Sequence, residues 1–237
     1  MADLPYTVLS CAMSLDGYLD DASGKRLVLS NAADLDRVDA VRAGCDAILV
    51  GAGTVRADNP RLLVRAEHRR ARRVAEGRAA SPHKVTVTRH PHLDPDAAFF
   101  STGDGDKLVY CASASVGRAR ERLGAAATVV DAGATPTMCV VSEDLAARGV
   151  RRLLVEGGQS VHTQFLCAGL ADELHVVVAP FFVGDSRAHR VVGDGPLPWN
   201  RGRRAHLAEV RRIEDVVLLR YALSTRFEQD EPTGAMR

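Results

Sequence analysis

Short apolar runs recur along the whole chain, and segments with helical or loop character separate them. Such runs, rich in valine, isoleucine and leucine, are typical of strands that are buried on both faces of a mainly parallel sheet. Helices then cover that sheet, because the crossovers between parallel strands carry them over its faces. The predicted strands cover residues 6–13, 47–50, 84–88, 107–111, 127–130, 153–156, 173–179 and 215–223. The chain is therefore predicted to be an α/β protein.

The segments between these runs refine the predicted architecture. Candidate crossover helices cover residues 33–43, 115–123, 142–147 and 160–168. The last two predicted strands are joined by a long connection with glycines and prolines but no clear helical repeat, so we expect them to pair antiparallel at one edge of the sheet. We predict a single domain over residues 1–223 and a flexible, polar tail over residues 224–237.

Composition limits the classes of function. The chain has 237 residues, of which 46% are hydrophobic, and this is enough for a substantial core. Its 31 basic and 30 acidic residues give a net charge of +1, so no overall field attracts it to nucleic acid or to a membrane surface. Neither a signal sequence nor a long apolar segment is present. We expect a cytoplasmic protein that binds neither nucleic acid nor membranes.

The arginine and cysteine patterns exclude two further kinds of site. Arginines crowd the segment from Arg65 to Arg78, but no aromatic side chains are interleaved for base stacking, so we expect a solvated insertion with loop or short-helix character. The five cysteines lie far apart and form no CxxC pair. This spacing indicates reduced thiols and no zinc or other metal site.

The stretch from Ala47 to Arg65 holds the most specific local pattern. Its apolar run ends in Gly51-Ala-Gly-Thr54, where backbone N–H groups can approach a phosphate at the start of a following helix. Arg56 stands where a dinucleotide-binding fingerprint has its third glycine, so an ordinary Rossmann fold is disfavoured. A strand-to-helix turn that needs small residues explains this spacing equally well.

A second glycine pair favours the phosphate interpretation. Gly157 and Gly158 follow another apolar run and precede a predicted helix. Two such loops at the carboxyl ends of strands in one sheet match the ligand crevice of open α/β folds, and the diphosphate of a dinucleotide would fit there. Thr88 and Arg89 follow a third strand and would offer a hydroxyl and a guanidinium to the 2′-phosphate that distinguishes NADP from NAD. An arginine in a surface loop explains Arg89 equally well.

Other polar residues have plainer explanations. Asp58 begins an Asp-Asn-Pro sequence, which is typical of a simple turn. His162 and His175 fit a helix face and a strand better than they fit catalytic positions. No arrangement of serine, histidine and aspartate has a spacing that supports nucleophilic catalysis.

Several segments taken together resemble one family, the riboflavin-biosynthesis pyrimidine reductases. They are MSLDG (residues 13–17), LSN (29–31), Arg42, DAILVGAGTVRADNPRLLVR (46–65), VEGG (155–158) and LADELHVVVAPFFVG (170–184). The resemblance extends from about Tyr6 to Tyr221. It implies a fold similar to dihydrofolate reductase, a homodimer and, since the zinc deaminase domain of the usual bacterial protein is missing, a stand-alone reductase.

The resemblance also implies a reaction and a cofactor. The family uses NADPH to deliver hydride to C1′ of a ring-opened sugar, and so converts the ribosyl group of a phosphorylated ribosylaminopyrimidine to ribityl. On the matching positions, the cofactor would be lined by Ser30, Gly51, Thr54, Gly157 and Gly158.

The same likeness assigns substrate contacts. Asp58 would bind beside the reacting end of the substrate and deliver or orient a proton. Arg42 and Arg65 would hold the phosphate, because guanidinium geometry suits that anion. The remaining substrate contacts would come from Asn31, Thr54, Leu62 and Glu156.

The chain departs from the family pattern at Ser10, where many bacterial members have a lysine that contacts substrate. It also has Ser30-Asn31 where family members commonly have Thr-Ser. These departures leave open a reductase of the same fold that acts on dihydrofolate, a pterin or a specialised pyrimidine. A nucleotide-binding protein without catalytic activity is the third reading.

Overall fold

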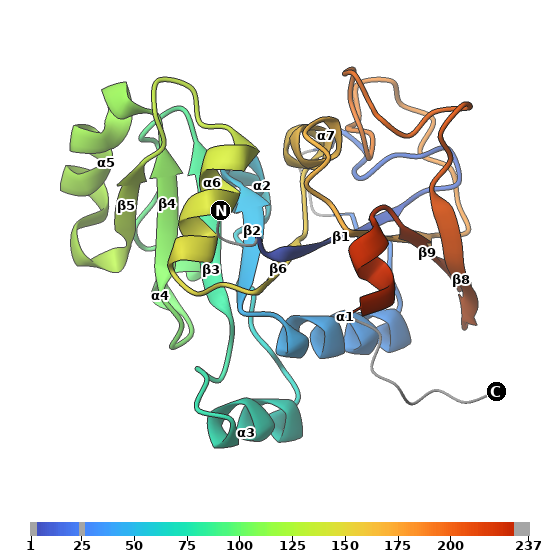
Figure 1. Ribbon diagram of the computed structural model, residues 1–237, viewed down its shortest axis with the longest axis horizontal. Coiled ribbons are helices and arrows are strands. Elements are labelled where there is room, and N and C mark those ends of the chain that lie inside the picture. The colour runs from blue at the N-terminus through green and yellow to red at the C-terminus, as the bar shows by residue number, and fades with distance from the viewer. Residues whose placement is uncertain (1–3, 24–26, 230–237) are drawn as a thin grey trace.

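The computed structural model describes residues 4–23 and 27–229, which form one nine-stranded sheet covered by helices on both faces (Figure 1). The strands are β1 (Tyr6–Met13), β2 (Ala47–Gly51), β3 (His83–Thr88), β4 (Lys107–Cys111), β5 (Thr128–Asp131), β6 (Arg152–Val155), β7 (Glu173–Val178), β8 (His206–Ile213) and β9 (Val216–Ala222). The α-helices are α1 (Ala32–Gly44), α2 (Ala52–Asp58), α3 (Glu67–Ala75), α4 (Ala98–Ser101), α5 (Val116–Leu123), α6 (Met138–Ala147) and α7 (Gln159–Cys167). Short 3-10 helices are η1 (Ser113–Ser115), η2 (Gly124–Ala126) and η3 (Thr225–Gln229).

The strand order is β5-β4-β3-β2-β6-β1-β7-β9-β8. Neighbouring strands from β5 to β7 pair in parallel, whereas β9 pairs antiparallel with both β7 and β8. The predicted α/β class, the mainly parallel sheet and the antiparallel C-terminal edge are confirmed. Every predicted strand is present, with small shifts at its ends.

Alternation along the strands divides the core into two layers. Ile48 and Val50 of β2 point into the layer that contains Phe99 of α4 and parts of α2 and α5. Leu49, which lies between them, points into the opposite layer with Phe165 of α7 and parts of α6. The central strands are therefore buried on both faces, which is why they are visible in the sequence as apolar runs.

The arginine-rich segment forms the short helix α3, which lies beyond α1 and away from the sheet (Figure 1). It is not wholly a solvated insertion. Arg73 is buried and donates to the backbone carbonyls of Ala43, Cys45 and Ala79, and these three acceptors replace the water that its guanidinium loses. Burial lowers the pKa of Arg73 from its ordinary value. This arginine ties α3 to the end of α1.

Two C-terminal segments differ from the expectation. β8 was not predicted, and it forms the outer strand beside β9. Residues 224–229 fall within the predicted flexible tail, yet they include η3, and Phe227 is buried. Arg226 of η3 donates to the Leu4 carbonyl, which fixes this turn against the first strand. The rest of the predicted tail, residues 230–237, lies outside the described residues.

Membrane, metal and thiol features are simple in the described part of the chain. None of its helices is both long and apolar enough to cross a bilayer. Over residues 4–23 and 27–229, no group of histidine, cysteine, aspartate and glutamate side chains is placed to hold a metal ion. All five cysteines are free thiols, and burial raises the pKa of Cys45 to about 12.

Candidate active site

The two glycine loops meet at the carboxyl edge of the sheet, because β2 and β6 are neighbours in it. The Gly51 N–H donates to the Gly157 carbonyl at 2.8 Å. A Cβ atom on Gly51 would stand only 3.0 Å from Cγ2 of Val161. Gly157 has a φ of +113°, which favours glycine, and a cis peptide bond joins it to Gly158. The structure is thus compatible with both interpretations of the glycines. The turn needs small residues, and the backbone at this edge has no side chains that would keep a phosphate away.

Thr54 and Asp58 lie at opposite ends of α2. The Thr54 hydroxyl would be 3.4 Å from a Cβ atom on Gly158, so it faces the second glycine loop. Asp58 is the last residue of α2 and is exposed. The helix ends there because Asn59 takes the left-handed conformation, with φ +43°, and its side-chain oxygen accepts from the Ala98 N–H. One helix therefore joins the glycine loops to the predicted proton donor.

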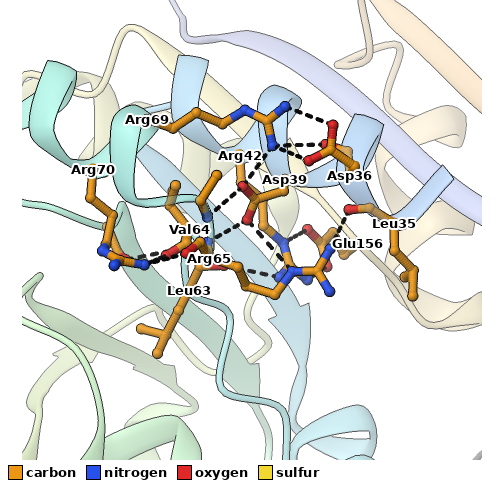
Figure 2. A network of polar contacts seen from close by, with 12 residues as sticks. Leu35, Asp36, Asp39, Arg42, Leu63, Val64, Arg65, Arg69, Arg70 and Glu156 are labelled. Carbon is orange, nitrogen blue, oxygen red and sulfur yellow. Dashed lines mark hydrogen bonds and ion pairs between the residues drawn. The ribbon is translucent and has the colours of Figure 1, made fainter. Parts of the chain in front are cut away.

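Arg42 and Glu156 form a largely buried ion pair with two hydrogen bonds at the end of β6 (Figure 2). Arg42 donates from Nε and Nη2 to the two carboxylate oxygens, each at 2.6 Å. Its Nη1 donates to the Leu63 carbonyl at 3.2 Å, so the pair also holds the loop that follows α2. Burial alone would lower the pKa of Arg42, yet the charge and hydrogen bonds of Glu156 raise it above its ordinary value. The sequence predicts Arg42 on a phosphate, but its donors are engaged with Glu156 and Leu63.

Arg65 is held from behind by Asp39, a buried residue that the sequence did not single out. The Asp39 carboxylate accepts from the backbone N–H groups of Arg65 and Ala66 and from Arg69 of α3 (Figure 2). Burial would raise the pKa of Asp39, but these hydrogen bonds and the Arg69 charge lower it overall. The Arg65 side chain remains 55% exposed. It borders a depression of about 290 Å³ lined by Asp36, Asp39, Arg65 and Ala66.

Three other predicted residues have structural roles in this structure. Asn31 caps α1: its side-chain oxygen accepts from the Asp34 N–H, and its amide donates to the Ile213 carbonyl and to Asp215. Ser30 precedes this cap and is half-buried. Leu62, predicted to pack on the substrate, is buried in the core layer of α2 and α4.

Thr88 and Arg89 lie at the end of β3, as predicted, but only one of the two side chains is exposed to a ligand. The Thr88 hydroxyl donates to the His90 carbonyl and accepts from the His90 N–H, so it is engaged within its own loop. Arg89 is exposed. The same loop borders a depression of about 400 Å³, whose lining residues are Pro91, His92, Arg118, Glu121 and Arg122.

Ser10 lies opposite His175 in the pairing of β1 with β7. His175 belongs to a buried charged cluster that the sequence did not predict, and its Nε2 contacts Glu173 at 2.7 Å. Arg220 of β9 donates to the same carboxylate, and Arg37 of α1 approaches the other imidazole nitrogen at 3.4 Å. Burial would raise the pKa of Glu173, but His175 and Arg220 lower it to about 2. The position where the family lysine is replaced is therefore the strand neighbour of one member of this cluster.

Residues 5–219 match the family model described as the RibD C-terminal domain. The match spans most of the chain and covers every site residue that the sequence predicted. The chain belongs to this family. The resemblance to the riboflavin-biosynthesis pyrimidine reductases and the fold expected from it are thereby confirmed.

Relatives with the same domain fall into two size classes. Several carry the name 2,5-diamino-6-ribosylamino-4(3H)-pyrimidinone 5′-phosphate reductase. The one from Archaeoglobus fulgidus is 34% identical over 191 residues, which are 81% of this chain and 87% of that protein. The one from Methanothermobacter thermautotrophicus is 34% identical over 192 residues, or 81% and 85%. The riboflavin biosynthesis protein RibD of Bacillus amyloliquefaciens is 35% identical over 196 residues, which are 81% of this chain but 50% of that protein.

Solved structures have the same fold at lower identity. RibD of Acinetobacter baumannii superposes with a TM-score of 0.76 and 24% identity, covering 92% of this chain and 58% of that one. A pyrimidine reductase-like protein of Corynebacterium diphtheriae has a TM-score of 0.74 and 22% identity, covering 92% and 91%. At these identities the solved structures support only the fold of this chain. Its reaction has to be inferred from the side chains at the site.

Proposed function

We propose that this chain reduces the ribosyl group of a phosphorylated ribosylaminopyrimidine to a ribityl group, as an oxidoreductase of riboflavin biosynthesis. The activity named for two relatives of similar length at 34% identity supports this proposal. The structural observation that carries it is the Arg42–Glu156 pair, which stands at the end of β6 directly before the glycine loop. This places a fixed carboxylate beside the edge where a dinucleotide would bind.

We propose NADPH as the cofactor. The two glycine loops suit its diphosphate, because a side chain on Gly51 would collide with Val161 and a bare backbone permits close approach. The starts of α2 and α7 present backbone N–H groups at the same edge. Thr54 would add a hydroxyl, and Ser30 would contact the cofactor from the start of α1. When bound, the reduced nicotinamide supplies a hydride.

Selection of NADPH over NADH is assigned to the loop after β3. Arg89 is exposed at the carboxyl end of that strand, where its guanidinium can bind a 2′-phosphate. Thr88 would act by shaping this loop, since its hydroxyl already bonds to His90.

The substrate phosphate is assigned to Arg65. Its guanidinium is exposed over the depression beside α1, and its backbone is fixed by Asp39. The Arg65 guanidinium also contacts Asp39, with Nε 3.7 Å from the carboxylate, and its Nη2 donates to the Leu35 carbonyl, so a phosphate would add to these contacts. Arg69 lies 2.9 Å from Asp39 and shares its negative charge. Thr54 would contact the substrate from the cofactor side.

The structure revises the role that the sequence gave to Arg42. Because its donors bind Glu156, we assign it to positioning that carboxylate and not to the phosphate. A carboxylate accepts hydrogen bonds from N–H groups, so Glu156 suits the amino-substituted edge of a 2,5-diaminopyrimidinone. Leu62 and Asn31 would support this surface from the core and from the cap of α1.

Asp58 is proposed to supply the proton. Reduction of the ring-opened C1′=N group adds a hydride to C1′ and a proton to nitrogen, and the product has one new C–H and one new N–H bond. Asp58 is exposed at the end of the helix that also carries Thr54, so one rigid element would hold the proton donor at a fixed distance from the cofactor.

The test is a direct assay with purified protein, NADPH and 2,5-diamino-6-ribosylamino-4(3H)-pyrimidinone 5′-phosphate. We expect loss of reduced-nicotinamide absorbance and a product two hydrogen atoms heavier. Asp58→Asn should slow turnover at least about 100-fold, as expected for loss of a general acid. Asp106→Asn, a change at an exposed carboxylate near the amino end of β4, is the matched control and should turn over normally. Wild-type turnover no faster than that of Asp58→Asn contradicts the proposal.

Parallel assays separate the alternative functions. The deaminated ribosylaminouracil phosphate tests which of the two pyrimidines is preferred, and dihydrofolate tests the pterin alternative. Calorimetry with NADPH tests the non-catalytic reading, which requires binding without oxidation of the cofactor on any of these substrates.

Three further expectations complete the proposal. We propose a homodimer, to be checked by light scattering, and a single reductase domain that includes residues 1–223 and extends through η3 to residue 229. We also propose a cytoplasmic location. The five free thiols, of which Cys45 and Cys111 are buried, support it, because a reducing compartment keeps such thiols unpaired.

A further inference from the structure

The outer edge of β8 is the least protected part of the sheet. β8 is the last strand in the strand order, and in Figure 1 it stands at the right-hand edge with no helix over its outer side. Val210 at its centre is 60% exposed, and Leu207 and Val217 of the same hairpin are also exposed. Natural proteins usually shield a strand edge of this length, because its unpaired N–H and C=O groups are a template for pairing with another chain.

The two faces of this hairpin differ. Arg211 of β8 lies opposite the buried Leu218 of β9, on the face covered by α1. Val210 lies opposite Leu219, on the other face, together with the exposed Val217. The Val210 face also carries the exposed Arg212, opposite Val217. The open edge therefore borders an apolar patch with one arginine on this face, and Glu209 and Arg211 on the other.

The charges favour one self-pairing of β8. When two copies pair antiparallel about a twofold axis at Val210, Val210 meets its own copy and Glu209 lies opposite Arg211. Shifting the axis by one residue places either Glu209 or Arg211 opposite itself, and like charges directly opposite are destabilising. Placing the axis on Arg212 has the same fault. An axis on Ala208 avoids like charges within β8, but it places Glu209 opposite Leu207 and forms no ion pair. Charge complementarity thus favours the Val210-centred register, which forms two Glu209–Arg211 pairs.

We propose that β8 binds β8 of a second copy of this chain in this register. The inference rests on the homodimer proposed above and assigns its interface. The contact is coupled to the site, because Asn31 at the start of α1 donates to the Ile213 carbonyl and to Asp215 at the β8–β9 turn. Pairing of the two edges would fix this turn and, through Asn31, the helix that carries Arg42.

The test uses opposite charges at the twofold axis. Val210→Lys and Val210→Glu each place like charges opposite each other, so each dimer dissociation constant should rise at least about tenfold. An equimolar mixture should form a heterodimer at least about tenfold tighter than either variant alone, since Lys then faces Glu. Val74→Lys is the control, because Val74 is 58% exposed on α3 and lies far from this edge. It should dimerise as the wild type does. Sedimentation measures association, and circular dichroism verifies folding.

A cross-link provides a second measurement that does not depend on disruption. Opposite residues of antiparallel strands have Cα atoms about 4.5–5.5 Å apart, within the range of a disulfide. Val210→Cys should therefore form a disulfide-linked dimer on mild oxidation, and Val74→Cys should not. A wild-type monomer would overturn both the homodimer and this interface. If the wild type is a dimer, if Val210→Lys still dimerises and if Val210→Cys forms no cross-link, the proposed interface is wrong although the homodimer stands. Neither result depends on the enzymatic activity of the protein.

Discussion

The Arg42–Glu156 pair gives the sharpest prediction about stability. Glu156→Gln keeps the shape of the side chain and one acceptor oxygen but removes the negative charge. The Arg42 guanidinium then keeps only the more distant charge of Asp39, and one of its donors faces an amide N–H₂ group. The side chains of Arg42 and Glu156 are only 18% and 14% exposed, so water replaces the lost carboxylate oxygen only in part.

The magnitude follows from this burial. Removing one partner of a buried ion pair costs about 3–5 kcal/mol, and the residual exposure of this pair places the effect near 3 kcal/mol. For a chain of this length, that corresponds to a fall of about 6–12 °C in Tm. Arg42→Met combined with Glu156→Leu removes both charges, and it should recover most of the loss because no unpaired charge remains.

The assay is urea unfolding followed by circular dichroism for the wild type, Glu156→Gln, Glu156→Leu, Arg42→Met and the double variant. Glu76→Gln serves as the control, since Glu76 pairs with Arg72 and Arg78 at the surface, and the loss of such pairs should change the free energy of unfolding by less than about 1 kcal/mol. Additive effects in the double variant, or a loss below about 1 kcal/mol in Glu156→Gln, would refute the reasoning, because the two charges would then be independent or solvated.

Three further predictions concern the glycine loop, a buried histidine and the choice of cofactor. Gly51→Ala places a methyl group about 3.0 Å from Val161, so we expect a loss of about 1–3 kcal/mol in urea unfolding and a raised KM for NADPH. Burial lowers the pKa of His162 from 6.5 to about 4, so between these pH values the unfolded chain binds a proton that the folded chain does not. As the pH is lowered from 6.5 to 4, this proton uptake should reduce the free energy of unfolding by about 1.4 kcal/mol per pH unit. His162→Gln should remove this contribution, and equal pH dependence of the two proteins would contradict a lowered pKa of His162. Arg89→Ala should raise KM for NADPH at least about tenfold with little change for NADH, and equal changes for both cofactors would exclude a contact with the 2′-phosphate.

The apolar runs predicted the parallel strands well because those strands are buried on both faces. β8 was missed for the opposite reason: it is exposed along most of its length, and HLAEVRRI mixes charged and apolar residues without a continuous run. The start of α6 was placed too late, since the helix begins at Met138 after Thr137, whose hydroxyl caps it. Prediction succeeded where burial shaped the sequence and failed at edges and caps.

The candidate site also contains residues that the sequence identified and residues that it missed. The glycine loops were recognisable because a close backbone contact requires glycine at Gly51 and Gly157. The pairing of Arg42 with Glu156 was not, because it joins positions 114 residues apart that only the adjacency of α1 and β6 brings together. Asp39 was missed for a similar reason, since nothing local marks it as the residue that holds Arg65.

Transfer of a labelled hydride tests the central claim most directly. NADPH carrying deuterium at the transferable position is incubated with the diaminopyrimidinone phosphate and the wild-type protein, and the product is analysed by mass spectrometry and nuclear magnetic resonance. The account predicts a ribityl product with one deuterium at C1′, formed at a greatly reduced rate by Asp58→Asn. Binding of NADPH without deuterium at C1′ of either pyrimidine would contradict it.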